Sequence, residues 1–144
     1  MPRAEHPKEI PSSSLSWIGD AVFELRVRER ILRGQSKANS GPLHRQGVHY
    51  SRAVWQAQAA DFLEPYLTEE ELWVYRRGRN HAPRSVAKHA PPQAYRKASG
   101  FEALIGYLYL IGANSRINEI LDLLWHLDEG QASAAREGLG ALSE

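Results

Sequence analysis

The most constraining feature of this sequence is an acidic residue in the middle of an apolar stretch, residues 15–24, which read LSWIGDAVFE. Apolar residues recur there at the three- and four-residue spacing of one buried helix face, namely Leu15, Ile18, Val22 and Leu25. Asp20 and its neighbour Gly19 should therefore lie beside that face. Since a glycine inside a helix costs roughly 0.5–1 kcal/mol relative to alanine, we expect another segment to approach the backbone closely at Gly19.

A second acid, Glu102, stands in the most apolar run of the chain, residues 101–110. One aspartate inside a helix is most simply a solvated or ion-paired side chain, but two acids in two apolar helices suggest a shared reason. If the two helices pack together, Asp20 and Glu102 can meet, and adjacent carboxylates repel unless a cation lies between them. Oxygen ligands of this kind suit Mg²⁺ or Mn²⁺. The pair therefore predicts a metal-dependent phosphodiesterase site.

The composition limits the class of protein. A chain of 144 residues is about one domain long, and the absence of cysteine excludes a disulfide scaffold and Cys-ligated zinc. The N-terminal residues lack the apolar centre of a signal peptide. The longest uncharged apolar run, residues 103–113, is shorter than the roughly 20 residues that span a bilayer. We expect a cytoplasmic protein without a membrane anchor.

Helix signals dominate the rest of the chain, and the predicted class is an all-α helical bundle forming one domain over residues 1–144. Residues 1–11 are a loose arm before a first helix, which Ser12–Ser14 cap and Gly34 ends. A second helical region, residues 42–67, is either one helix broken near Gly47 or two helices. Thr68 and Glu71 form a capping box for a helix that ends at Gly78. Further helices are predicted at residues 93–111, 114–130 and, more weakly, 131–142.

Basic residues are concentrated between positions 76 and 97, where seven Lys or Arg occur without an acid, although the formal net charge is only +1. Within this basic strip, residues 81–92 hold three prolines and no apolar period, which predicts an exposed basic loop. We favour a substrate-contacting loop over a disordered linker. The predicted polyanion contacts are Arg77, Arg79, Asn80, Arg84, Lys88 and Arg96. A second group, residues 44–52, is either a phosphate-contacting face or an ordinary wet surface.

Residues 17–24 (WIGDAVFE), 76–80 (RRGRN) and 100–110 (GFEALIGYLYL) resemble the ribonuclease III nuclease domain. The closer resemblance is to Mini-ribonuclease III, the short form without a double-stranded-RNA-binding domain, and it extends from about residue 15 to about residue 127. It implies an endoribonuclease that cleaves double-stranded RNA, with Asp20 and Glu102 as catalytic ligands of Mg²⁺ and with Mn²⁺ as a substitute. It further implies a role in the maturation of precursor 23S ribosomal RNA.

The resemblance also implies a homodimer in which each subunit cuts one strand. Trp17 matches the family's aromatic residue at the dimer contact, although a buried core tryptophan is a rival interpretation. The longer ribonuclease III enzymes hold two further acids, where this chain has Ser16 and Ser99, so the number of metal ions per site stays open. The alternative function is a non-catalytic RNA- or ribosome-binding module with a degenerate ribonuclease III fold. A third interpretation, a helical protein-interaction domain, leaves the basic strip unexplained.

Overall fold

The computed structural model describes residues 6–82 and 91–142, with side chains to residue 130. These residues form six α-helices: α1 (Ser12–Gly34), α2 (Ser40–Ser51), α3 (Ala53–Leu63), α4 (Glu69–Asn80), α5 (Pro92–Leu110) and α6 (Asn114–Leu142). Two short 3-10 helices, η1 (Pro7–Glu9) and η2 (Glu64–Tyr66), precede α1 and α4. The described part of the chain contains no strand, so the predicted all-α class is confirmed.

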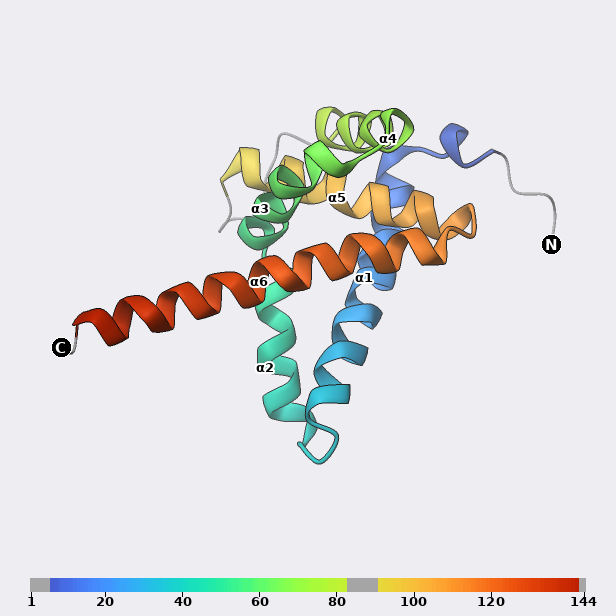
Figure 1. Ribbon diagram of the computed structural model, residues 1–144. Coiled ribbons are helices and arrows are strands. Elements are labelled where there is room, and N and C mark those ends of the chain that lie inside the picture. Colours follow the sequence, from blue (N-terminus) through green and yellow to red (C-terminus); the bar gives the residue numbers. More distant parts are fainter. Residues whose placement is uncertain (1–5, 83–90, 143–144) are drawn as a thin grey trace.

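Helix α5 is the centre of the arrangement, because α1, α3 and α4 all pack against it (Figure 1). Helices α1 and α2 form a hairpin that extends away from this centre, and α6 lies across the bundle (Figure 1). Most of the buried apolar side chains of α1 and α3 to α6 belong to one core cluster. None of the helices in residues 6–82 and 91–142 is long and apolar enough to cross a membrane.

The buried face of α1 differs from the predicted one. Its buried residues recur every four positions, at Leu15, Gly19, Phe23, Val27 and Ile31. Leu25, which the periodicity placed on the buried face, is 57% exposed. The prediction failed because a count of apolar residues gives no weight to glycine, and Gly19 lies within the buried face. The predicted capping by Ser12–Ser14 is also wrong, since Pro11 occupies the N-cap without a side-chain hydrogen bond.

Glycines allow α5 to contact its neighbours backbone against backbone. A Cβ atom on Gly19 would lie 1.7 Å from the carbonyl oxygen of Glu102, and one on Gly106 would lie 2.1 Å from that of Leu15. The expected close approach at Gly19 is thus confirmed, and the approaching segment is α5. On the other side of α5, a Cβ atom on Gly100 would lie 2.6 Å from the carbonyl oxygen of Tyr75 in α4. No side chain fits at these positions.

Two predicted helix boundaries are wrong. Gly78 does not end α4, which continues to Asn80, because Gly78 is buried against Gly100 and Ala103 of α5. For residues 42–67 the structure agrees with the two-helix alternative, and the break between α2 and α3 falls at Arg52, while Gly47 lies inside α2. Helix α6 runs through Gly130 as one helix, where two had been predicted.

Two predicted helix ends are confirmed. The capping box is present, with the Thr68 hydroxyl accepting from the Glu71 amide and the Glu71 carboxylate accepting from the Thr68 amide. Gly112 ends α5 with φ +77°, a left-handed conformation that suits glycine. Glu71 is also buried and ion-paired with Arg116 at 2.8 Å, which the capping pattern does not predict. Burial opposes ionisation, but the hydrogen bonds from Arg116 prevail and lower the pKa of Glu71. The Glu71 carboxylate thus caps the N-terminus of α4 and, through Arg116, holds α6 against α4.

Candidate active site

The crossing of α1 and α5 brings the two predicted catalytic acids together. Gly19 touches the backbone of Glu102, so the adjacent Asp20 projects at the edge of the same contact. Glu102 is partly buried, whereas Asp20 is exposed. Burial, followed by the charge of Asp20, raises the pKa of Glu102 to about 8. Partial burial of its carboxyl, followed by the charge of Glu24, raises the pKa of Asp20, while hydrogen bonding with Glu102 acts in the opposite direction.

The chemistry of this pair fits a divalent cation. Neither carboxyl has a Lys, Arg or His partner among the described residues, so their mutual repulsion is not offset. A hard dication would favour ionisation of both groups. Within residues 6–82 and 91–130 no third Asp, Glu or His joins them. Two carboxylates fit Mg²⁺, which keeps several waters and shares its remaining positions with substrate phosphates.

The comparisons with known proteins agree with this geometry. The family described as the Ribonuclease III domain matches residues 13–112, a span that contains both acids. A Mini-ribonuclease 3 from Symbiobacterium thermophilum is 44% identical over 120 residues, covering 83% of this chain and 91% of the relative. The chain belongs to the Mini-ribonuclease 3 family. That family consists of endoribonucleases of the ribonuclease III type that act on double-stranded RNA.

Two further matches extend the comparison. A Mini-ribonuclease 3 from Clostridium tetani is 36% identical over 136 residues, covering 94% of this chain and 90% of the relative. Among solved structures, a protein from Fusobacterium nucleatum superposes with a TM-score of 0.77 at 22% identity, covering 87% of this chain and 99% of that one. At that identity the second likeness supports the fold alone.

A hydroxyl joins the two helices beside the acids. Ser16 Oγ in α1 donates a hydrogen bond of 2.6 Å to the backbone carbonyl of Ser99 in α5. Both serines stand out in the sequence only as departures from the acids of the longer ribonuclease III enzymes. The contact could not be read from the sequence, because the two residues are 83 positions apart.

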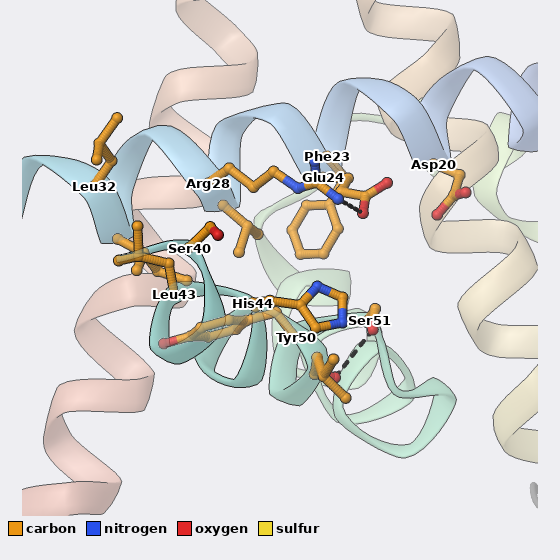
Figure 2. Close-up of a pocket in the computed structure, with 14 residues that line it drawn as sticks. Asp20, Phe23, Glu24, Arg28, Leu32, Ser40, Leu43, His44, Tyr50 and Ser51 are labelled. Atoms are coloured by element: carbon orange, nitrogen blue, oxygen red, sulfur yellow. Dashed lines mark hydrogen bonds and ion pairs between the residues drawn. The ribbon is translucent and has the colours of Figure 1, made fainter. Parts of the chain in front are cut away.

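Asp20 also stands at one end of a groove of about 330 Å³ between α1 and α2. Figure 2 shows Asp20 at one end of this groove and Leu32 at the other. Its wall is mostly apolar, with His44 as a polar group from α2. His44 belongs to the second basic group of the sequence, which therefore lies partly toward α1 and not wholly in bulk solvent.

Several cations of the basic strip already have partners within the chain. Arg77 donates hydrogen bonds of 2.7 and 2.8 Å to the carbonyls of Lys8 and Ile10. It thereby holds residues 8–10, which had been predicted to be part of a loose arm. Lys97 forms a 2.8 Å ion pair with Asp61, and Arg79 lies 3.9 Å from Glu64. The acids of α3 and η2 offset this positive charge, which the linear count of residues 76–97 could not reveal.

The other predicted contacts of this family member are less constrained. Asn80 accepts a hydrogen bond from Arg79 at the end of α4. Arg96 is half-buried, and its Nε has no hydrogen-bond partner among the described residues. Arg76, which was not among the predicted contacts, is exposed and forms no ion pair within the described residues. Arg84 and Lys88, with most of the predicted basic loop, lie outside the described residues.

Trp17 is 81% exposed, the largest exposed fraction among the large apolar side chains described. The interpretation of Trp17 as a core residue is therefore wrong. Leu25 and Leu32 of the same helix are 57% and 50% exposed. These three side chains form an apolar stripe on α1 (Trp17, Leu25 and Leu32), each at least half exposed in the part of the chain that the structure describes.

Proposed function

We propose that this chain hydrolyses both strands of double-stranded RNA at the Asp20–Glu102 site with Mg²⁺, and that Mn²⁺ can substitute. Its proposed natural substrate is the duplex formed by the ends of precursor 23S ribosomal RNA. The relatives are bacterial proteins, so we place the reaction in the bacterial cytoplasm, where ribosomal RNA is made. The observation that carries the proposal is the meeting of Asp20 and Glu102 at a solvent-accessible helix crossing, with no cationic partner for either acid among residues 6–82 and 91–130.

The chain's own contribution is to hold two carboxylates in a fixed relation. When bound, Mg²⁺ supplies a Lewis acid that orients water and stabilises the charge developing on the phosphate. Asp20 approaches it from α1 and Glu102 from α5. Backbone contact at Gly19 limits movement between the two helices, so the carboxylates need little rearrangement before reaction. Without a cation, burial and the charge of Asp20 raise the pKa of Glu102 to about 8, and a cation held by both acids would favour its ionised form.

We propose that Arg76, Arg79, Asn80, Arg84, Lys88 and Arg96 contact the RNA. A-form duplexes are recognised mainly through phosphates and 2′-hydroxyls, for which guanidinium, ammonium and amide groups are suitable. Arg77 contributes least in this proposal, because its guanidinium is already bonded to the carbonyls of Lys8 and Ile10.

We further propose that the chain acts as a homodimer through the apolar stripe on α1, with Trp17 at the contact. An exposed tryptophan on the same helix as exposed leucines is compatible with a protein interface. One site per subunit would then cut one strand each.

The test is cleavage of a labelled RNA duplex by the full chain with Mg²⁺, with Mn²⁺ and with a chelator. Duplex DNA and single-stranded RNA of the same sequence are substrate controls. Asp20→Asn should lower the rate by roughly 10²–10³-fold or more and keep the fold. The matched control is Asp122→Asn, an exposed acid of α6, which should cut normally. Salt-dependent RNA binding without cleavage would instead support a non-catalytic RNA-binding module.

A further inference from the structure

The hydrogen bond between Ser16 and Ser99 lies one helical turn from the two acids. Ser16 precedes Asp20 by four residues on α1, and Ser99 precedes Glu102 by three on α5, so both pairs share a helix face. The 2.6 Å bond from Ser16 Oγ to the Ser99 carbonyl therefore joins the helices beside the carboxylates. We propose that the Ser16 hydroxyl is a positioning group that sets the separation of Asp20 and Glu102, and with it the affinity of the site for a divalent cation. This inference rests on the proposed function.

The serine bond joins the two helices away from the glycine contacts. Gly19 meets the backbone of Glu102 and Gly106 meets that of Leu15, so the glycines let the two backbones touch and set the distance between the helix axes. The Ser16–Ser99 bond adds a directional link at a third place. Because Asp20 lies on one helix and Glu102 on the other, a small change in the crossing would change the distance between their carboxyls.

The Ser99 carbonyl can accept this hydrogen bond and still keep its own hydrogen bond within α5. A helical carbonyl at position 99 accepts from the amide four residues later, and its oxygen has a second lone pair. The Ser16 hydroxyl uses that lone pair, so the link adds a bond and breaks none in the helix. Its single hydrogen is then committed, and Ser16 Oγ offers only acceptor capacity to a hydrated cation nearby. The group is neutral, so it does not add to the repulsion between the two acids.

The experiment compares metal binding in variants that keep or remove this hydroxyl. Mn²⁺ is titrated calorimetrically into the RNA-free chain for wild type, Ser16→Ala, Ser16→Cys and Ser16→Thr. Cysteine keeps the size of the side chain with a much weaker donor, and threonine keeps the hydroxyl. The matched control is Ser14→Ala, an exposed serine of the same helix. Thermal unfolding and duplex cleavage at saturating Mn²⁺ are measured in parallel.

We expect Ser16→Ala and Ser16→Cys to weaken Mn²⁺ binding about tenfold, the usual cost of losing a group that orients a metal ligand. Ser16→Thr and Ser14→Ala should bind within a factor of two or so of wild type. The KM for duplex RNA should not change, since the hydroxyl does not bind the RNA.

Three results would overturn the inference. One is unchanged Mn²⁺ affinity in Ser16→Ala and Ser16→Cys, even with a lower melting temperature, because the bond would then only stabilise the fold. Another is a Ser16→Thr variant as weak as Ser16→Ala. The third is a wild type that binds no Mn²⁺. A wild type that binds Mn²⁺ through Ser16 but cuts no duplex would refute the proposed function and leave this inference standing.

Discussion

A Cβ atom on Gly19 would lie 1.7 Å from the carbonyl oxygen of Glu102, well inside any van der Waals contact. The helix that carries Asp20 therefore meets the helix that carries Glu102 with no side chain between them. The position of the two carboxylates is a direct consequence, because each leaves its backbone within one residue of the contact. Four expectations follow from this geometry and its surroundings.

Gly19→Ala should destabilise the chain severely. The added methyl group would clash with the backbone carbonyl of Glu102, which cannot move away as a flexible side chain could. We therefore expect the unfolding free energy to fall by more than about 3 kcal/mol. The matched control is Gly47→Ala in α2, where an added Cβ has no atom within 4 Å. That change should stabilise by roughly 0.5–1 kcal/mol. Chemical denaturation measures both, and equal effects would contradict the described crossing.

The metal-free chain should lose stability as pH rises between about 4.5 and about 8. Glu102 titrates near 4.5 in the unfolded chain, whereas burial and the charge of Asp20 raise its pKa in the folded chain to about 8. The unfolded state therefore binds fewer protons over this range, so rising pH favours unfolding. Glu102→Gln removes the effect and should exceed wild type at pH 8 by at least about 1.4 kcal/mol, the value of one pKa unit.

Urea titrations in a chelating buffer at several pH values provide the measurement for Glu102. Added Mn²⁺ should restore the stability of wild type at pH 8 and leave that of Glu102→Gln nearly unchanged, because binding to the folded state alone stabilises it. Parallel stability curves for the two proteins across this pH range would show that Glu102 is not perturbed.

Arg76→Ala and Arg77→Ala should have different effects although the residues are neighbours. Arg76 is exposed, and losing one phosphate contact should reduce the slope of log affinity against log salt concentration by up to about 0.9. Arg77 instead holds the carbonyls of Lys8 and Ile10, so its loss should cost about 1–2 kcal/mol of stability and leave the slope unchanged. Duplex binding at several salt concentrations decides this. The reverse pattern would make Arg77 the RNA contact.

Trp17→Ala should shift the proposed homodimer toward monomer. Removing the most exposed large side chain of α1 should raise the dimer dissociation constant at least about tenfold, as truncation of a central aromatic usually does. Trp73→Ala, on α4, is the matched control and should keep the dimer. Sedimentation velocity over a concentration series distinguishes them. A wild type that sediments as a monomer at micromolar concentration would refute the paired-site arrangement.

Sequence periodicity and capping signals were enough to predict the helical class, the course of α1 and α5, and the capping box of Thr68 and Glu71. These features depend on residues within one or two turns of each other. The meeting of Asp20 with Glu102 was also predictable, because an unexplained charge in each of two apolar helices has a common explanation if they touch. The resemblance to ribonuclease III pointed to the same pair.

The failures concern residues whose role is decided by a distant partner. Gly78 has the usual sequence signature of a helix end. In the structure it is a glycine because α5 packs closely against it and leaves no space for a side chain. Arg77 has the signature of an RNA contact, but its partners are 67 and 69 positions away. Ser16 was noticed only as a departure from the longer enzymes, and its hydrogen bond could not be predicted because the acceptor lies in another helix. Local sequence patterns predict secondary structure, but they do not predict which distant residues a side chain contacts.

The glycine contacts on both sides of α5 have a practical meaning for laboratory evolution of this nuclease. Gly19 and Gly106 seat α5 against α1, and Gly78 and Gly100 seat it against α4, so a side chain at any of these four positions would collide with the neighbouring helix. A mutant library that randomises these four codons would consist largely of misfolded clones. Mutations intended to change metal-ion preference or turnover should instead be introduced at side chains that border the two acids. The four glycines should be left unchanged in such a library.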